Sequence, residues 1–308
     1  MTVLGIISPL IIVALIGYLC AKKQWLSEPQ LSGISKLTFS IFIPAFLFFR
    51  MATADLSSQL QPSLFLSFYL PVLICFGLAW ILNQKWHHKY SQNSAASAVY
   101  ALGSSYSNTI IVGLPILVTV MGDKALPIIF LIVTFHSAML FALTSALASQ
   151  QGGVNWLGFI KQTLNNPLII AILSGLIVNV SGLTLPELVA KSLTLLSEPA
   201  ITLALFCLGA SIAKYNIRGE RRFIALACTV KLLLLPLLVF LMASHIFELD
   251  TMVIQVLVVL SACPTGVNAY LLAQMHKVHR KAVASTVVAT TICSVVTIPV
   301  WMLFIELQ

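Results

Sequence analysis

Two short polar stretches interrupt long apolar runs of the sequence, and their residue types favour the binding of a small anion. The first begins as Gly-Ser-Ser-Tyr-Ser-Asn-Thr over 103–109, and the second covers 261–268. Proline removes a backbone donor and clashes with the preceding turn, while glycine lets the chain leave helical geometry. Backbone groups freed inside a membrane must line a cavity or bind something. Helix N-termini exposed there favour anions.

The side chains of these stretches are the predicted substrate-binding residues. Asn108 and Asn268 supply amide donors and acceptors without charge. The alternative is an ordinary kinked helix whose Ser and Thr side chains bond back to their own backbone. Two interruptions in corresponding places favour a transporter binding site instead. The predicted set is Ser105, Ser107, Asn108, Thr109, Gly113 and Pro115 from the first stretch, and Cys263, Pro264, Thr265, Gly266 and Asn268 from the second.

Three ionisable residues, His136, Glu198 and Lys231, fall inside apolar runs. Such groups are costly in a membrane and usually functional. Glu198 and Lys231 lie in successive runs at depths that differ by roughly 5–8 Å. They are interpreted either as a proton-linked or substrate-sensing pair, or as a structural ion pair or a lysine on backbone carbonyls. His136 is either a donor to a bound carboxylate or proton carrier, or a neutral histidine hydrogen-bonded to a neighbour.

The elements that carry these residues are predicted to be membrane-spanning helices. Apolar residues make up 59% of the 308 residues and charged residues only 8%, against roughly 25% charged in a soluble domain. The apolar runs are about 20 residues long, which suffices to cross a ~30 Å hydrocarbon core. The ten predicted spans are 2–21, 33–51, 62–83, 94–121, 125–149, 163–182, 190–213, 222–245, 252–275 and 282–305.

The basic residues predict the orientation of these spans. Only Arg50, Lys124 and Lys191 lie on the side reached after the even-numbered spans. Since Lys and Arg concentrate on the cytoplasmic side, we expect a multi-pass protein of the cell inner membrane with both termini outside. The same reasoning explains the net charge of +8 without nucleic acid. The opposite, cytoplasmic set is Lys22, Lys23, Lys36, Lys85, Lys89, Lys161, Lys214, Arg218, Arg221, Arg222, Lys277, Arg280 and Lys281.

Enzymatic and metal chemistry find little support in the sequence. All six cysteines lie inside apolar segments, without a CxxC pair or a histidine at metal-ligand spacing. The spans hold no HExxH, no GxSxG and no pair of carboxylates. The sequence therefore predicts no cofactor, no metal and no enzyme activity.

A weak internal repeat relates the two halves of the chain. Pro-Leu-Ile-Ile occurs at 9–12 and again at 167–170, and Leu15 and Gly17 continue the match as Leu173 and Gly175, at an offset of 158. Pro44-Ala45 matches Pro199-Ala200 at an offset of 155, and Asn108 matches Asn268 at 160. Five spans per copy would invert the second copy. We therefore expect an all-α membrane protein of two inverted five-helix repeats, 1–150 and 151–308, with the site at the midplane between them.

Short motifs follow one another along the whole chain: Gly17-Tyr18 with Lys22-Lys23, Pro44-Ala45, Ser107-Asn108-Thr109, Gly113-Leu114-Pro115, Phe206 to Ala213, Lys231 with Pro236, Cys263-Pro264-Thr265, and Ala282 to Trp301. Their order resembles that of the auxin efflux carrier family, which includes bacterial malonate-transporter-like members and plant auxin carriers. The resemblance covers essentially the whole chain. It implies a ten-helix fold similar to sodium/proton antiporters and bile-acid symporters, in which broken helices 4 and 9 cross. It also implies an organic-anion substrate bound near Asn108 and Asn268, and suggests a homodimer.

One departure from the wider fold group concerns coupling. The bile-acid symporters place acidic sodium ligands near the second crossing and the antiporters carry an aspartate pair, whereas no acidic residue lies between Leu257 and Gln274 or in span 4. The predicted function is secondary transport of small organic anions, such as malonate-like or auxin-like carboxylates, by alternating access and without sodium. A sodium-coupled symporter of the same fold, and a membrane-embedded sensor that retains the carrier fold, are the alternatives. The expected partners are the organic anion, the lipid bilayer and a second copy of the chain.

Overall fold

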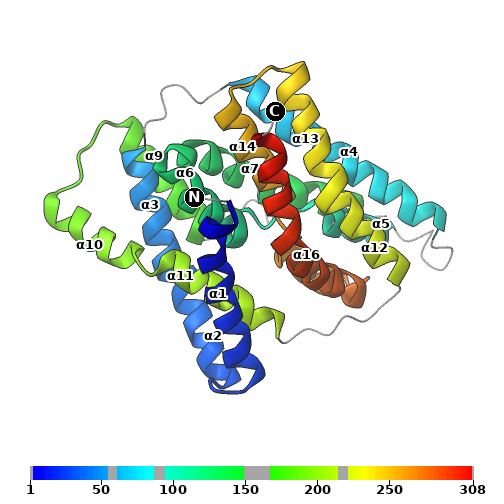
Figure 1. The fold of residues 1–308 in the computed structure, drawn as a ribbon, viewed down its shortest axis with the longest axis horizontal. Helices are drawn as coiled ribbons and strands as arrows, with labels where there is room; N and C mark the ends of the chain where they lie inside the picture. The colour runs from blue at the N-terminus through cyan, green and yellow to red at the C-terminus, as the bar shows by residue number, and fades with distance from the viewer. Residues whose placement is uncertain (1–2, 55–60, 87–93, 149–166, 214–220, 307–308) are drawn as a thin grey trace. The chain divides into compact units, whose positions relative to one another are not determined.

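The structure is a computed structural model that describes residues 3–54, 61–86, 94–148, 167–213 and 221–306 (Figure 1). These residues are helical almost throughout, and the one pairing of extended backbone among them is a single antiparallel bridge between Ser107 and Thr265. Mean hydropathy and helix length agree with a membrane protein. Six helical stretches are long and apolar enough to cross a membrane: 28–53, 62–85, 109–148, 187–212, 221–246 and 280–306.

Three shorter apolar helices, 8–22, 167–180 and 251–262, accompany those six stretches. The fold is therefore all-helical and apolar, as predicted. The ten-span arrangement and its inversion stay predictions. Contacts divide the chain into two compact units, and each unit takes segments from both predicted halves.

The first unit comprises the described parts of 1–59, 114–134 and 156–214. Its helices are α1 Val3–Lys22, α2 Glu28–Leu37, η1 Thr38–Phe42, α3 Ile43–Thr53, α6 Leu114–Met121, η3 Gly122–Ala125, the start of α7 Leu126–Ala148, α9 Pro167–Val180, α10 Glu187–Ser197 and α11 Ala200–Ile212.

Two helix pairs in this unit approach at glycines. A Cβ on Gly17 of α1 would lie 2.0 Å from the Phe206 carbonyl oxygen of α11, and a Cβ on Gly175 of α9 would lie 2.7 Å from the Phe48 carbonyl oxygen of α3. Figure 1 shows α1 and α11 side by side. Gly17 and Gly175 are 158 positions apart, and so are Phe48 and Phe206. The offset found in the sequence thus also relates two sets of contacts.

The second unit comprises the described parts of 60–113, 135–155 and 215–308. Its helices are α4 Pro62–Trp86, α5 Ser94–Ser105, η2 Thr109–Gly113, the remainder of α7, α12 Arg221–Thr229, η4 Val230–Leu234, α13 Leu235–Leu241, η5 Met242–Ile246, α14 Thr251–Ala262, α15 Asn268–Met275 and α16 Arg280–Glu306.

Polar side chains connect the helices of the second unit at buried and half-buried positions. Asn83 of α4 donates to Ser97 of α5 over 3.0 Å. The Tyr100 hydroxyl of α5 donates to the Phe223 carbonyl of α12 over 2.8 Å. The Trp301 ring N–H of α16 donates to the Leu232 carbonyl of η4 over 2.9 Å. These bonds fix the positions of α4, α12 and α16 relative to their neighbours, and the interrupted helices pack in the same unit.

Three π-helical turns precede prolines by two residues. The turns η1, η2 and η4 end at Phe42, Gly113 and Leu234. Pro44, Pro115 and Pro236 follow them within continuing helices. Proline has no N–H and clashes with the carbonyl four residues earlier, and an extra residue in the preceding turn accommodates it. Lys231 lies in η4.

Candidate functional site

Both interruptions predicted from the sequence are present, and their extended segments cross within the second unit. Helix α5 ends at Ser105 and helical structure resumes at Thr109; α14 ends at Ala262 and α15 begins at Asn268. The Asn108 N–H donates to the Pro264 carbonyl over 2.8 Å, and the Gly266 N–H donates to the Tyr106 carbonyl over 3.1 Å. These bonds flank Ser107 and Thr265, which form the antiparallel bridge.

The bridge defines the register between the two halves at this point. Ser107 and Thr265 are 158 positions apart, the offset that also relates Gly17 to Gly175. At this offset the counterpart of Asn108 is Gly266, so the amide of Asn268, matched to Asn108 at an offset of 160, lies two residues further along its segment. The two asparagines therefore have different local roles.

The outward N–H groups of the bridge are satisfied by side chains of two other helices. In a continuous α-helix the Ser107 and Thr265 N–H groups would donate to Gly103 and Ser261. Instead, the Ser107 N–H donates to His136 Nε2 over 3.0 Å. The Thr265 N–H donates to Thr290 Oγ1 over 3.0 Å. The freed donors are thus held by α7 and α16 respectively.

The carbonyls freed by the interruptions also find partners. The Thr265 hydroxyl donates to the Gly103 carbonyl over 2.7 Å. The Lys231 ammonium donates to the Ser261 carbonyl. Gly103 and Ser261 are again 158 positions apart. Equivalent carbonyls therefore receive a neutral hydroxyl in one half and an ammonium in the other.

Asn108 caps the helix that follows the first interruption and keeps one donor unused. Its Oδ1 accepts from the Ile111 N–H over 3.3 Å, which is the bond an N-cap residue makes. The residue is 6% exposed. Its Nδ2 is buried and has no hydrogen-bond partner among the described residues.

His136 presents a second unused donor close to this cap. Because its Nε2 accepts the Ser107 N–H, that nitrogen carries no proton, and the proton of a neutral ring lies on Nδ1. The residue is 1% exposed. Its Nδ1 lacks a hydrogen-bond partner in the described part of the chain. The ring stacks on Tyr106 at 5.1 Å between centroids.

Tyr106 links the second asparagine to α7. Asn268 Nδ2 donates to the Tyr106 hydroxyl over 3.3 Å, and that hydroxyl is 2.8 Å from Ser137 Oγ. The ring packs against Gly266, where a Cβ would lie 2.3 Å from Tyr106 Cε1. The predicted Gly266 is therefore needed for close approach, and Asn268 is engaged within the protein.

The other predicted site residues are distributed as follows. Ser105 donates to the Ala101 carbonyl over 2.8 Å, the pattern of the kinked-helix alternative. Thr109 is buried at the start of η2. Gly113 packs against Leu260 and Cys263. Pro115 lies in α6, which belongs to the first unit, and Pro264 supplies the carbonyl that Asn108 binds.

The two charged residues predicted to lie within spans, Lys231 and Glu198, belong to different units. Lys231 is fully buried in the second unit, on the Ser261 carbonyl, which matches one interpretation drawn from the sequence. Glu198 is exposed in the first unit. Their predicted pairing stays a prediction.

Sequence reasoning missed several residues of the crossing. Tyr106 and Thr290 were not selected, and neither were the carbonyls of Gly103 and Ser261. Tyr106 stands inside the first polar stretch, and Thr290 stands beside Thr291 in an apolar run. Their polarity was visible, but only the folded backbone shows which freed groups they meet.

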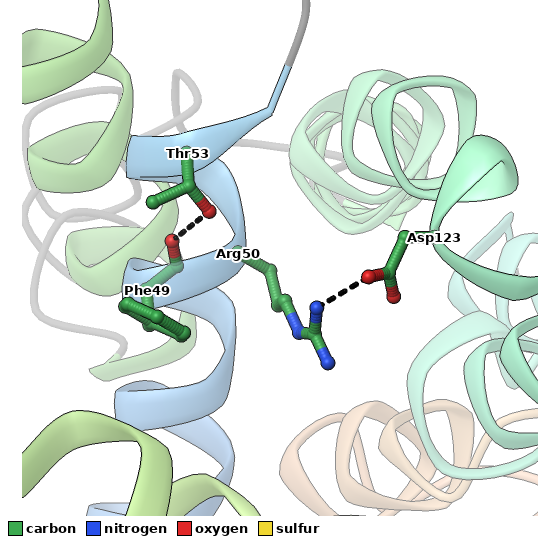
Figure 2. Close-up of polar contacts among 4 residues, drawn as sticks. All are labelled: Phe49, Arg50, Thr53 and Asp123. Carbon is green, nitrogen blue, oxygen red and sulfur yellow. Dashed lines mark hydrogen bonds and ion pairs between the residues drawn. The ribbon is translucent and has the colours of Figure 1, made fainter. Parts of the chain in front are cut away.

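An ion pair joins two elements of the first unit. Figure 2 shows the Arg50 guanidinium reaching from α3 toward Asp123 in η3, while the Thr53 hydroxyl donates back to the Phe49 carbonyl. The Asp123 side chain is 61% exposed. Exposed pairs contribute about 0–1 kcal/mol, so this pair positions α3 and η3 without dominating stability.

Comparison with known proteins decides the family. The model of a family described as membrane transport protein matches residues 2–157 and 155–302. The chain belongs to this membrane transport protein family, the auxin efflux carrier family that its motifs resemble.

Relatives within the family are distant but span nearly the whole chain. One from Rhizobium meliloti (strain 1021), named as a candidate malonate transporter, is 22% identical over 306 residues, covering 96% of this chain and 93% of its own. The uncharacterized transporter YfdV of Escherichia coli (strain K12) is 22% identical over 308 residues, covering 97% and 96%. Auxin efflux carrier component 8 of Arabidopsis thaliana is 25% identical over 336 residues, covering 91% of each chain.

Proposed function

We propose that this member of the membrane transport protein family is a secondary active transporter of small organic anions, which binds a carboxylate beside the crossing segments. The observation that carries the proposal is the pair of unused buried donors, Asn108 Nδ2 and His136 Nδ1. A buried polar group without a partner costs about 1–3 kcal/mol. An anionic oxygen is the natural acceptor for two such donors.

The surroundings of these donors support an anion. Asn108 follows Ser107 in the chain, and His136 accepts the Ser107 N–H, so both residues belong to the surroundings of the same segment. The N-terminus of the helix that starts at Thr109 adds partial positive charge. The rings of Tyr106 and Phe68 contact His136 and offer an apolar surface to the organic part of a substrate.

We infer that transport is not driven by sodium. Sodium sites need several oxygen ligands, and carboxylates commonly provide some of them. Neither 94–121 nor 257–274 contains Asp or Glu. We propose that transport is coupled to protons. The alternative is a sodium site built from carbonyl oxygens, and the experiment below distinguishes the two.

The architecture and placement proposed for the chain follow the same line. Contacts related by an offset of 158 in both units support two inverted repeats, an architecture that serves alternating access in transporters. The proposal includes ten spans in the cell inner membrane, both termini outside, a lipid environment and a homodimer. It includes no nucleic acid, cofactor or catalytic reaction.

The test is ligand binding followed by transport. Purified protein should be stabilised against heat by small carboxylates or indole acids and not by matched neutral compounds, because a ligand of the native state raises apparent stability. Reconstituted vesicles should then take up the stabilising anion without sodium and respond to a pH gradient. Strict sodium dependence would refute the coupling proposal, and binding without any transport would favour a sensor.

A further inference from the structure

The backbone hydrogen bonds at the crossing are two-fold symmetric: the Tyr106–Gly266 and Asn108–Pro264 bonds correspond to each other. The Ser107 and Thr265 N–H groups also both donate to a side chain, although the acceptors, His136 and Thr290, are not at equivalent positions. The freed carbonyls break the pattern. Gly103 accepts from the Thr265 hydroxyl, whereas Ser261 accepts from Lys231.

Because Lys231 occupies the Ser261 carbonyl, the Ser107 hydroxyl lacks the hydrogen bond that its counterpart Thr265 makes. Ser107 is opposite Thr265 in the bridge and 158 positions before it, as Gly103 is before Ser261. The pair formed by the Ser107 hydroxyl and the Ser261 carbonyl is therefore equivalent to the pair formed by the Thr265 hydroxyl and the Gly103 carbonyl. Yet Ser107 is 1% exposed, and its Oγ has no hydrogen-bond partner among the described residues.

The charge of Lys231 is also uncompensated. Within the described residues, no carboxylate forms an ion pair with it. His136, Cys75 and Cys263 interact with it electrostatically, and none of them is a carboxylic acid. In the part of the chain that the structure describes, the one hydrogen-bond partner of this fully buried ammonium is a neutral backbone carbonyl, so an anion that reached it would bind it more strongly.

We propose that Lys231 and the Ser107 hydroxyl are alternative donors to the Ser261 carbonyl. When Lys231 turns away from the crossing, Ser107 rotates onto the carbonyl, and no buried acceptor is left without a partner. Lys231 is then a positioning residue whose charge can be released inside the protein. In the setting of the proposed function, on which this last step rests, the released charge attracts the carboxylate of the substrate.

The test in the absence of substrate is a double-mutant cycle on thermal unfolding in detergent. Ser107→Ala should change the midpoint little in the wild type, because the hydroxyl is unused there. It should lower the midpoint by at least about 2 °C more in a Lys231→Met background, where Ser107 is the remaining donor. Ser104→Ala is the matched control. Ser104 is buried one turn earlier and bonds to the Tyr100 carbonyl of its own helix, so its effect should be the same in both backgrounds.

Two outcomes would overturn the exchange. Equal effects of Ser107→Ala in the two backgrounds would mean that the hydroxyl never replaces the ammonium. If Lys231→Met failed to fold although Ser107 was intact, the Ser107 hydroxyl would also be shown not to replace the ammonium. Lys231→Gln, which keeps a polar donor at this position, is the control for packing. Ser107→Ala should again have little effect in this background, and a loss as large as in the Lys231→Met background would contradict the proposal.

A second readout separates this exchange from the proposed function. If the substrate draws Lys231 away, Ser107→Ala should weaken binding of the anion found in the thermal screen by about threefold or more, while Ser104→Ala leaves binding unchanged. Unaltered binding in Ser107→Ala would refute the link to the substrate. If no anion binds to the wild type, the proposed function fails, but the substrate-free cycle still decides the exchange.

Discussion

The Thr265 hydroxyl donates a 2.7 Å hydrogen bond to the Gly103 carbonyl. This bond replaces the helical one that the Ser107 N–H would make to Gly103 if α5 continued. Thr265 and Gly103 belong to segments that are far apart in the chain. Thr265 is fully buried, so the bond supplies a donor to a carbonyl that would otherwise lack one.

Removal of this hydroxyl should therefore be costly. Thr265→Val keeps the shape of the side chain but leaves the Gly103 carbonyl without its donor, and we expect a loss of about 1–3 kcal/mol. Thr265→Ser retains the hydroxyl and should lose less. Thermal unfolding and hydrogen exchange around 103–107 measure the difference, and equal stability of the Val and Ser variants would contradict this assignment.

Asn108→Asp is the sharpest test of the anion site. Aspartate can still cap the helix through a side-chain oxygen, but it replaces the unused Nδ2 donor with an acceptor and, when ionised, with a like charge. Calorimetry should show substrate binding weakened by roughly tenfold or more, which corresponds to 1.4 kcal/mol. Asn108→Ala should also weaken binding, through loss of the same donor.

Asn83→Ala is the control for both asparagine variants. Asn83 is fully buried in the same unit and bonds to Ser97, away from the crossing. Its replacement should lower stability without changing the affinity of the folded protein. If Asn108→Asp bound the anion as tightly as the wild type does, the carboxylate would have to bind elsewhere. If Asn108→Asp bound a cation more tightly than the wild type does, the ligand of this site would be a cation and not an anion.

Glycine substitutions test the helix contact of the first unit. A Cβ at Gly209 would lie 1.7 Å from the Ala14 carbonyl oxygen, so Gly209→Ala should separate α1 from α11 and destabilise the fold by about 1–3 kcal/mol. Gly77 of α4 has nothing within 4 Å of its Cβ position. Gly77→Ala should be neutral or stabilising by up to about 1 kcal/mol. Similar melting of both variants would exclude tight packing at Gly209.

Single cysteines test the proposed orientation. In a background without the six native cysteines, Cys at Lys124 or Thr184 should react with impermeant reagents added outside intact cells. Cys at Ser27 or Arg280 should react only after the membrane is opened. All four positions are exposed. Reaction of the second pair in intact cells, with protection of the first, would reverse the topology derived from the basic residues.

The helices and their interruptions were predictable because the signals are local. Pro264 and Gly266 flank Thr265, and Gly103 and Gly113 lie on either side of Ser107; together with the polar residues between them they favour a break in the helix. Apolar runs of sufficient length predict spans without knowledge of neighbours. Asn108 was predicted to be a site residue from its type and its place in the sequence. Its unused Nδ2 could not be predicted, because a partner for an amide depends on what packs against it.

The sequence by itself determined an apolar, all-helical chain of this transporter family with two polar breaks, since composition, periodicity and residue order need no coordinates. Only the tertiary structure decided how the backbone groups at the breaks are satisfied. The register that sets Ser107 opposite Thr265 comes from the crossing of segments some 158 residues apart. The same crossing gives the Ser261 carbonyl to Lys231 and the Ser107 N–H to His136. Hydrogen bonds are short and directional, so a partner is fixed by positions in space that no local pattern encodes.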